Sequence, residues 1–187
     1  MRLENSFEVE APPEQAWDLL MDVPRVVPCM PGATLDEAVD DSNWKATMQV
    51  KLGPIGLTFA TDISRQTVDE ESRSVTLDAN ARDVKNRGRA SAKVQSTLVP
   101  LDGRTRVDIV TDLTLTGTVA QYGRGMVQDI SSQMVDSFAK CLQSQLAAEP
   151  EEAERAVAAQ ARPVSGLSLF FRSVRRSLAR LFRRRSA

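Results

Sequence analysis

Apolar and polar side chains alternate along most of residues 1–117, which is the pattern of strands buried on one face. In "LENSFEVE", residues 3–10, apolar side chains share one parity and three glutamates the other. Residues 44–117 repeat this alternation between the turn signals "GPIG", "DEES" and "LDGR". An antiparallel meander is the simplest arrangement of such strands. The inward positions include Trp44, Ala46, Leu57, Phe59, Thr61, Ile63, Leu77, Ala79, Ala81, Ala90, Ala92, Val94, Ile109, Leu113 and Leu115.

Two segments depart from this alternation. "APPEQAWDLLMDV", residues 11–23, has a helical spacing of apolar residues after two prolines, and a short, proline-broken helical turn or loop follows to residue 32. From 119 to 146 the period is again helical and predicts one long amphipathic helix. We expect an α+β domain over residues 1–146, in which a bent antiparallel sheet of about seven strands wraps around this helix.

The inward face of the predicted sheet is small, because alanines occupy it on two successive strands, at 79, 81, 90 and 92. Tight packing of the helix would explain this pattern, and so would a hollow that larger side chains do not fill. Methionines on the helix, such as Met126 and Met134, suit irregular ligands but are also common in ordinary cores. The pattern by itself leaves both interpretations open.

The end of the chain is different in character. Residues 147–164 form a polar linker, compatible with either a solvated helix or disorder. Residues 165–187 carry seven arginines and no acidic residue, whereas the rest of the chain is net acidic. As a helix, 165–187 separates an apolar stripe from a basic face, and we predict that it lies on anionic membrane lipids. Its predicted membrane-binding residues are Leu167, Phe170, Phe171, Arg172, Val174, Arg175, Arg176, Leu178, Arg180, Leu181, Phe182 and Arg183.

Three other uses of this stripe remain open. It could pack back on the domain, fill a groove on a partner protein, or bind nucleic acid. The last fits worst, since a nucleic-acid arm does not need an apolar face. We therefore expect no nucleic acid among the partners.

The composition limits the chemistry. The chain has no histidine, which excludes a Ser-His-Asp or Cys-His site and a typical zinc site. Its two cysteines, Cys29 and Cys141, have no metal-binding spacing, and we expect two free thiols in a reducing compartment. No secretory signal and no apolar run long enough to span a bilayer is visible. We expect no catalytic residue, metal or covalent cofactor, and a location on the cytoplasmic face of the plasma membrane.

Several segments resemble the CoxG family of carbon monoxide dehydrogenase subunits, which belongs to the START-like (SRPBCC) superfamily. They are "FEVEAPPEQAWDLLMDVPRVVPCMPGATLDE", "MQVKLGPIGLTF", "GRASAKV" and "GTVAQYGRGMVQDISSQMVDSFAKCL". The resemblance implies a helix-grip fold, a cavity for an apolar molecule between sheet and helix, and association with a molybdenum-containing carbon monoxide dehydrogenase as an accessory, non-catalytic subunit.

The sequence and the family resemblance together favour one function and leave two alternatives open. The protein would carry a hydrophobic small molecule, a respiratory isoprenoid quinone such as menaquinone or ubiquinone, from the membrane to the carbon monoxide dehydrogenase complex. Alternatively it is a ligand-free anchor or assembly factor, or a cyclase or hydrolase acting on an apolar substrate. We expect the mouth of the cavity at residues 23–32, "VPRVVPCMPG". The predicted ligand-binding residues are Val26, Cys29, Met30, Phe59, Leu77, Ala79, Ala92, Leu113, Tyr122, Met126, Ile130, Met134 and Phe138.

Overall fold

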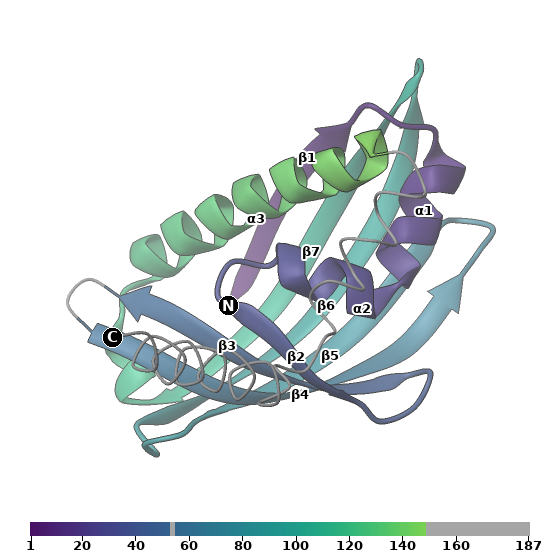
Figure 1. The fold of residues 1–187 in the computed structure, drawn as a ribbon. Helices are drawn as coiled ribbons and strands as arrows, with labels where there is room; N and C mark the ends of the chain where they lie inside the picture. The colour runs from purple at the N-terminus through teal and green to yellow at the C-terminus, as the bar shows by residue number, and fades with distance from the viewer. Residues whose placement is uncertain (53–54, 149–187) are drawn as a thin grey trace, which may run out of the picture. The chain divides into compact units, whose positions relative to one another are not determined.

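The computed structural model describes residues 1–52 and 55–148, which form one compact unit (Figure 1). Most of the predicted linker and the whole predicted membrane helix, residues 165–187, lie outside the described residues. The strands are β1 (Arg2–Val9), β2 (Ala33–Ala38), β3 (Asn43–Leu52), β4 (Ile55–Asp69), β5 (Ser74–Asp83), β6 (Gly88–Leu101) and β7 (Arg104–Gly117). The helices are α1 (Pro13–Met21), α2 (Val23–Val26), the 3₁₀ turns η1 (Val27–Cys29) and η2 (Thr118–Gln121), and α3 (Arg124–Ala147).

The strands form one antiparallel sheet in the order β1-β7-β6-β5-β4-β3-β2. Figure 1 shows the sheet curving around a single concave side, where α3 lies. Register shifts in β2 and near Arg65 in β4 interrupt the regular pairing, and such irregularities bend strands. The predicted α+β, helix-grip architecture is confirmed. The sequence did not suggest β2, because most of its residues are exposed and their alternation carries little hydrophobic signal.

The long helix begins later than its periodicity predicted. Residues Thr118–Gln121 form a 3₁₀ turn, and Tyr122 and Gly123 are extended before α3 starts at Arg124. Apolar residues on both sides of this break continue the helical spacing, so the pattern could not reveal it. The break turns the chain from the end of β7 back across the concave side.

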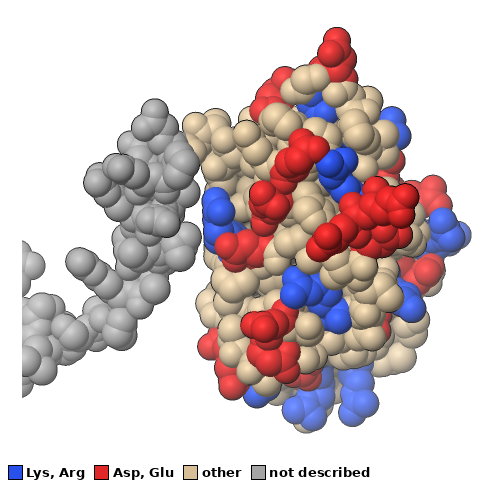
Figure 2. Space-filling view, turned by 90° about the vertical axis from the view of Figure 1, so that its right-hand side faces the viewer, with Lys and Arg blue, Asp and Glu red and all other residues tan. Residues whose placement is uncertain are grey.

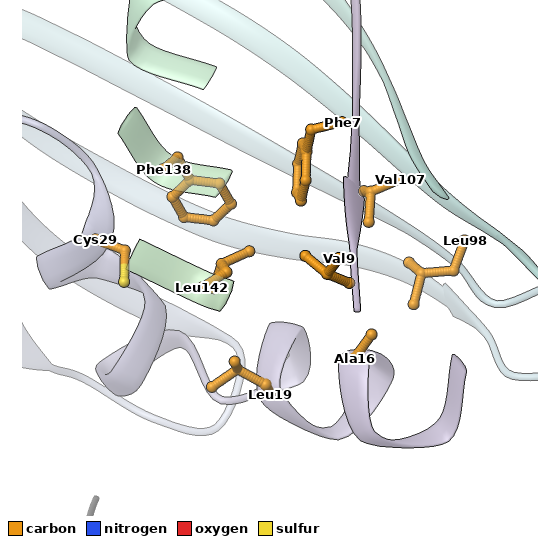
Figure 3. Packing of buried hydrophobic residues seen from close by; sticks show 9 residues of the cluster. All are labelled: Phe7, Val9, Ala16, Leu19, Cys29, Leu98, Val107, Phe138 and Leu142. Carbon is orange, nitrogen blue, oxygen red and sulfur yellow. The ribbon is translucent and has the colours of Figure 1, made fainter. Parts of the chain in front are cut away.

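The main core packs the C-terminal half of α3 against β1 and α1 (Figure 3). Phe138 and Leu142, in the C-terminal half of α3, pack with Phe7 and Val9 of β1, and the two phenylalanine rings meet edge to face at 6.0 Å between centroids. Burial of each such side chain stabilises the fold by roughly 1.5–3 kcal/mol. The remaining buried members of this cluster are Ala16, Leu19, Cys29, Leu98 and Val107.

Two smaller clusters hold other parts of the sheet. In one, Val23 and Val27 pack on Trp44, which attaches α2 and η1 to β3. In the other, Val119 packs on Leu57 and Phe59, which attaches η2 to the start of β4. The core therefore consists of three separate contacts between the sheet and its covering elements.

Cys29 and Cys141 form a disulfide with their Cα atoms 5.4 Å apart, so the expectation of two free thiols is wrong. Their separation of 112 positions hides this proximity in the sequence. The bond joins η1 to α3, and the Gln145 side-chain amide donates to the Arg25 carbonyl at 3.0 Å and to the Cys29 sulfur at 3.1 Å. The C-terminal half of α3 is thus attached to the α2–η1 segment both covalently and through hydrogen bonds.

Gly32 follows closely after this bond and brings the chain onto the sheet. Its φ of +78° favours glycine, and a Cβ there would lie 2.2 Å from the Gln49 carbonyl oxygen. The Gly32 carbonyl instead accepts from the Gln49 N–H at 2.8 Å. The "C-M-P-G" segment therefore joins α3 through its cysteine and β3 through its glycine.

Removing the disulfide tests how much this attachment contributes. We expect Cys141→Ala to lower the free energy of unfolding by about 2–4 kcal/mol, because the bond closes a long loop in the unfolded chain. Chemical denaturation with and without a dithiol reductant measures this. Reductant should destabilise the wild-type protein and leave Cys141→Ala unchanged, since the chain has two cysteines only. Equal denaturation midpoints for the oxidised wild-type and the variant would contradict the prediction.

Candidate functional site

The start of α3, up to Met134, does not take part in the packed core. Ile130 and Met134 are only partly buried and belong to none of the three clusters. They lie on the same side of the helix as Cys141, which follows Met134 by seven residues. Cys141 is bonded to η1 on the concave side. Apolar side chains of α3 therefore face the sheet without being covered by it.

The opposite wall is the middle of the sheet. Ala79 pairs with Ala92, which pairs in turn with Leu113, so one short row of small and medium side chains crosses β5, β6 and β7. These residues share the inward parity with Leu77 and Val94, and all five are only partly buried and outside the clusters. An interior packed to normal density would bury such side chains. We call the partly accessible apolar surface of these two walls the hollow, and it is the candidate site.

The predicted ligand-binding residues divide into two groups. Seven of them belong to the walls or the helix stripe and remain accessible: Leu77, Ala79, Ala92, Leu113, Ile130, Met134 and, 44% exposed, Met126. Cys29, Phe59 and Phe138 are buried within the clusters, and Val26 and Met30 pack partly buried against the main one. Tyr122 is partly buried at the break before α3. The first group thus lies on the two walls, and the buried members of the second group belong to the packed clusters.

One polar atom stands out beside the hollow. The Thr61 hydroxyl oxygen, on the inward parity of β4, is buried without a hydrogen-bond partner in the structure. A hydroxyl in this position loses the bonds that water would supply, unless a ligand provides an acceptor. The sequence placed Thr61 on the inward parity, but the predicted ligand-binding residues did not include it.

Two charged residues fall on the inward parity near strand ends, and both have structural partners. Arg65 donates to the Met21 and Asp41 carbonyls and lies over the Trp44 ring at 5.4 Å. Asp83 is fully buried and accepts from Arg87 at 2.8 and 2.9 Å, which holds the pKa of its carboxyl far below the usual range. Neither group is available for acid-base chemistry in the hollow.

The segment predicted to be the mouth, residues 23–32, is firmly attached. Val23, Val27 and Cys29 are buried, and the segment is held by the disulfide and by Gln145. The Asp22 side chain also accepts from the Arg25 N–H at the start of α2. An opening there would require these contacts to break.

Neither a membrane span nor a metal-binding cluster is found among the described residues. No helix within 1–52 and 55–148 is both long and apolar enough to cross a bilayer. The same residues contain no group of three or more Cys, Asp or Glu side chains arranged to hold a metal ion.

A bent seven-stranded antiparallel sheet, a long C-terminal helix and an apolar hollow between them define a START-like helix-grip protein. Residues 6–147 match the CoxG family of carbon monoxide dehydrogenase subunits, and the chain belongs to that family. A search of curated protein sequences found no match.

Solved structures show the same fold at low sequence identity. A conserved protein from Geobacillus kaustophilus has 21% identity and a TM-score of 0.70, with 79% of this chain and 95% of that chain covered. The ZhuI aromatase/cyclase from Streptomyces sp. R1128 has 16% identity and a TM-score of 0.54, covering 87% and 99%. A START superfamily protein from Mycobacterium smegmatis has 16% identity and a TM-score of 0.53, covering 78% and 96%.

Enlarging one wall residue tests whether the hollow is open. We expect Ala92→Leu to change the free energy of unfolding by no more than about 0.5 kcal/mol, because the added atoms enter unfilled space. Ala16→Leu is the matched control, since Ala16 is 2% exposed in the main core, and overpacking there should cost about 1–3 kcal/mol. Urea denaturation measures both variants. Equal losses would show that the sheet centre is as tightly packed as the core.

Proposed function

We propose that the protein is a ligand-binding accessory of carbon monoxide dehydrogenase that carries a lipophilic molecule in the hollow between α3 and the sheet. The observation that carries the proposal is the set of inward apolar residues, on α3 and on β5–β7, that no cluster covers. Contact of apolar surface with water has a free-energy cost of about 25 cal/mol per Å², and a bound apolar ligand would remove that cost.

An isoprenoid quinone suits this role. Oxidation of carbon monoxide by water yields carbon dioxide, two protons and two electrons, and reduction of a quinone to a quinol consumes two electrons and two protons. The isoprenoid chain would occupy the apolar walls, and a quinone carbonyl would accept a hydrogen bond from the otherwise unpaired Thr61 hydroxyl. The redox step belongs to the enzyme, so this protein needs no catalytic residue of its own.

The predicted amphipathic helix, residues 165–187, would hold the carrier on the cytoplasmic face of the plasma membrane, where quinones dissolve. Two signals act together in that segment, apolar side chains and arginines, and two signals give stable yet reversible attachment. The polar linker, residues 147–164, would let the folded unit turn between the bilayer and a soluble enzyme.

The fold also permits other functions. The similarity to an aromatase/cyclase shows the architecture alone, and both inward-parity charges already have structural partners. A ligand-free anchor would need no hollow, so the exposed apolar walls favour a carrier over an anchor.

Quinone binding can be tested through Thr61. We expect menaquinone or ubiquinone in lipid extracts of protein purified from membranes, identified by mass spectrometry. Thr61→Val should weaken quinone binding in detergent about fivefold and leave the free energy of unfolding unchanged or higher, because the lost hydroxyl has no protein partner. In the control Thr105→Val, the lost hydroxyl donates to the Ala11 carbonyl at 2.8 Å, so stability should fall and quinone affinity should not.

Repeated absence of quinone from the extracts, together with unchanged affinity in Thr61→Val, would remove quinone as the ligand. If the purified protein also carried no other lipid, the anchor function would replace the carrier function.

The role of the C-terminal segment has its own test. Deleting residues 165–187 should move the protein from the membrane fraction to the soluble fraction while quinone binding in detergent persists. Phe170→Ala with Phe171→Ala should weaken sedimentation with phosphatidylglycerol vesicles at least tenfold, because two buried aromatic rings are lost. Arg175→Lys with Arg176→Lys keeps the charge and should bind nearly as well. Unchanged membrane association after the deletion would refute this role.

A further inference from the structure

One end of the sheet gathers several turns that are distant in sequence. Leu52 pairs with Ile55 at the β3–β4 hairpin, Arg82 pairs with Arg89 beside the β5–β6 turn, and Gly88 pairs with Gly117 where β7 ends. Figure 1 shows these turns at the lower left together with the start of α3. We call this region the hairpin end; the main core and the end of α3 lie away from it.

Positive charge is concentrated at the hairpin end, although the described unit as a whole is net acidic. Among the described residues of the hairpin end, the acidic residue is Asp83, which is buried and bonded to Arg87. The next acidic residue along α3 is Asp129, more than a turn beyond the start of the helix. The basic residues of the hairpin end are Lys51, Arg82, Lys85, Arg87, Arg89 and Arg124.

The rest of the unit has the opposite character. Figure 2 views the molecule from the right of Figure 1, the side away from the hairpin end, and the largest continuous charged area there is acidic. The β4–β5 turn, which lies on that side in Figure 1, carries Asp69, Glu70 and Glu71. The charges are therefore segregated along the unit.

The basic residues of the hairpin end are also poorly paired. Within the part of the chain that the structure describes, one of these six cations, Arg87, forms an ion pair. Of the nine described cations elsewhere, five have an acidic partner: Arg2, Lys45, Arg73, Arg104 and Arg106. Arg82 and Arg89 even lie directly opposite each other on neighbouring strands, an arrangement that disfavours folding. Folding alone does not account for this charge, which suits an anionic surface outside the protein.

Exposed apolar side chains lie among these cations. Ile55 is 42% exposed at the β3–β4 hairpin, Val84 is 57% exposed at the β5–β6 turn, and Met126 is 44% exposed in the first turn of α3. Met126 continues the stripe of Ile130 and Met134 that forms one wall of the hollow. The apolar surface of the hollow thus extends to the basic end of the unit.

We propose that the hairpin end is the surface with which the folded unit docks on the anionic bilayer, and that the hollow opens there, between α3 and the adjoining ends of β3 and β4. This inference deepens the proposed function, because a carrier needs an opening on the side from which its ligand comes. Cations hold the unit at the lipid headgroups, and the exposed Ile, Val and Met side chains enter the interface. An acidic protein partner would match the charge, but it gives no reason for apolar side chains beside the hollow.

The docking can be measured in the full-length protein without any ligand. An indole introduced by Val84→Trp should be quenched by brominated phosphatidylcholine in vesicles that also contain phosphatidylglycerol. Val68→Trp is the matched control, because Val68 is 42% exposed in β4 next to the β4–β5 turn, on the opposite side of the unit. We expect quenching in the first variant and little in the second. Similar quenching in both, or none in either, would overturn the proposal.

Charge reversal tests the cause of the docking. Adding Lys85→Glu, Arg89→Glu and Arg124→Glu to the Val84→Trp protein should reduce quenching about tenfold or more, since each cation near an anionic membrane contributes to binding. Lys93→Glu with Lys140→Glu changes charge elsewhere on the unit and should leave quenching intact. Undiminished quenching after reversal at the hairpin end would overturn the proposal. Loss of binding to the dehydrogenase with undiminished quenching would assign this surface to the enzyme instead.

Ligand binding and membrane docking can be tested separately. Quinone binding in detergent tests the hollow, and quenching in ligand-free vesicles tests the docking surface. A protein that docks but binds neither quinone nor another lipid would refute the proposed function alone. A protein that binds quinone in detergent without docking through Val84 would refute this inference alone.

Discussion

The rest of the structure depends on how α3 is attached, because its covalent and apolar contacts are concentrated in its C-terminal half. Phe138 and Leu142 pack on β1, Cys141 is bonded to Cys29, and Gln145 donates to the α2–η1 segment. Further toward its start, the helix makes polar contacts with β1, where Asn5 bonds with Ser131 and Ser132. A helix held in this way lies along one edge of the curved sheet and leaves the sheet centre uncovered. The hollow is a consequence of where the strong contacts are placed.

This arrangement separates stability from binding. The three clusters that stabilise the fold lie around the hollow, and the side chains that line it contribute little to them. Small residues such as Ala79 and Ala92 occupy little space on the inward face of the sheet. The inward charged residues, Arg65 and Asp83, are bonded to partners outside the hollow. On the proposed function, a ligand would enter or leave without breaking the core.

The sequence predicted most of the fold because the alternation of residues 3–10 and 44–117 is strong. It missed β2, whose residues are mainly exposed, and it extended the last helix across Tyr122 and Gly123, where the periodicity continues through a break. The Cys29–Cys141 bond was missed because the two residues are 112 positions apart. The mouth was sought in a proline-broken segment that proves to be well anchored by Val23, Val27 and this bond.

By itself the sequence determined the order of elements, the inward face of each strand and the basic character of residues 165–187, since periodicity and charge are local properties. The tertiary structure decided how far the small inward residues are covered, and it leaves Ala79 and Ala92 partly accessible and outside the packed clusters. The reason is that their burial depends on where α3 lies relative to β5 and β6, which no local pattern records. It also gathered Lys51, Arg82, Lys85 and Arg124 at one end of the sheet. In the sequence these cations are scattered; only the antiparallel register turns them into one surface beside the hollow.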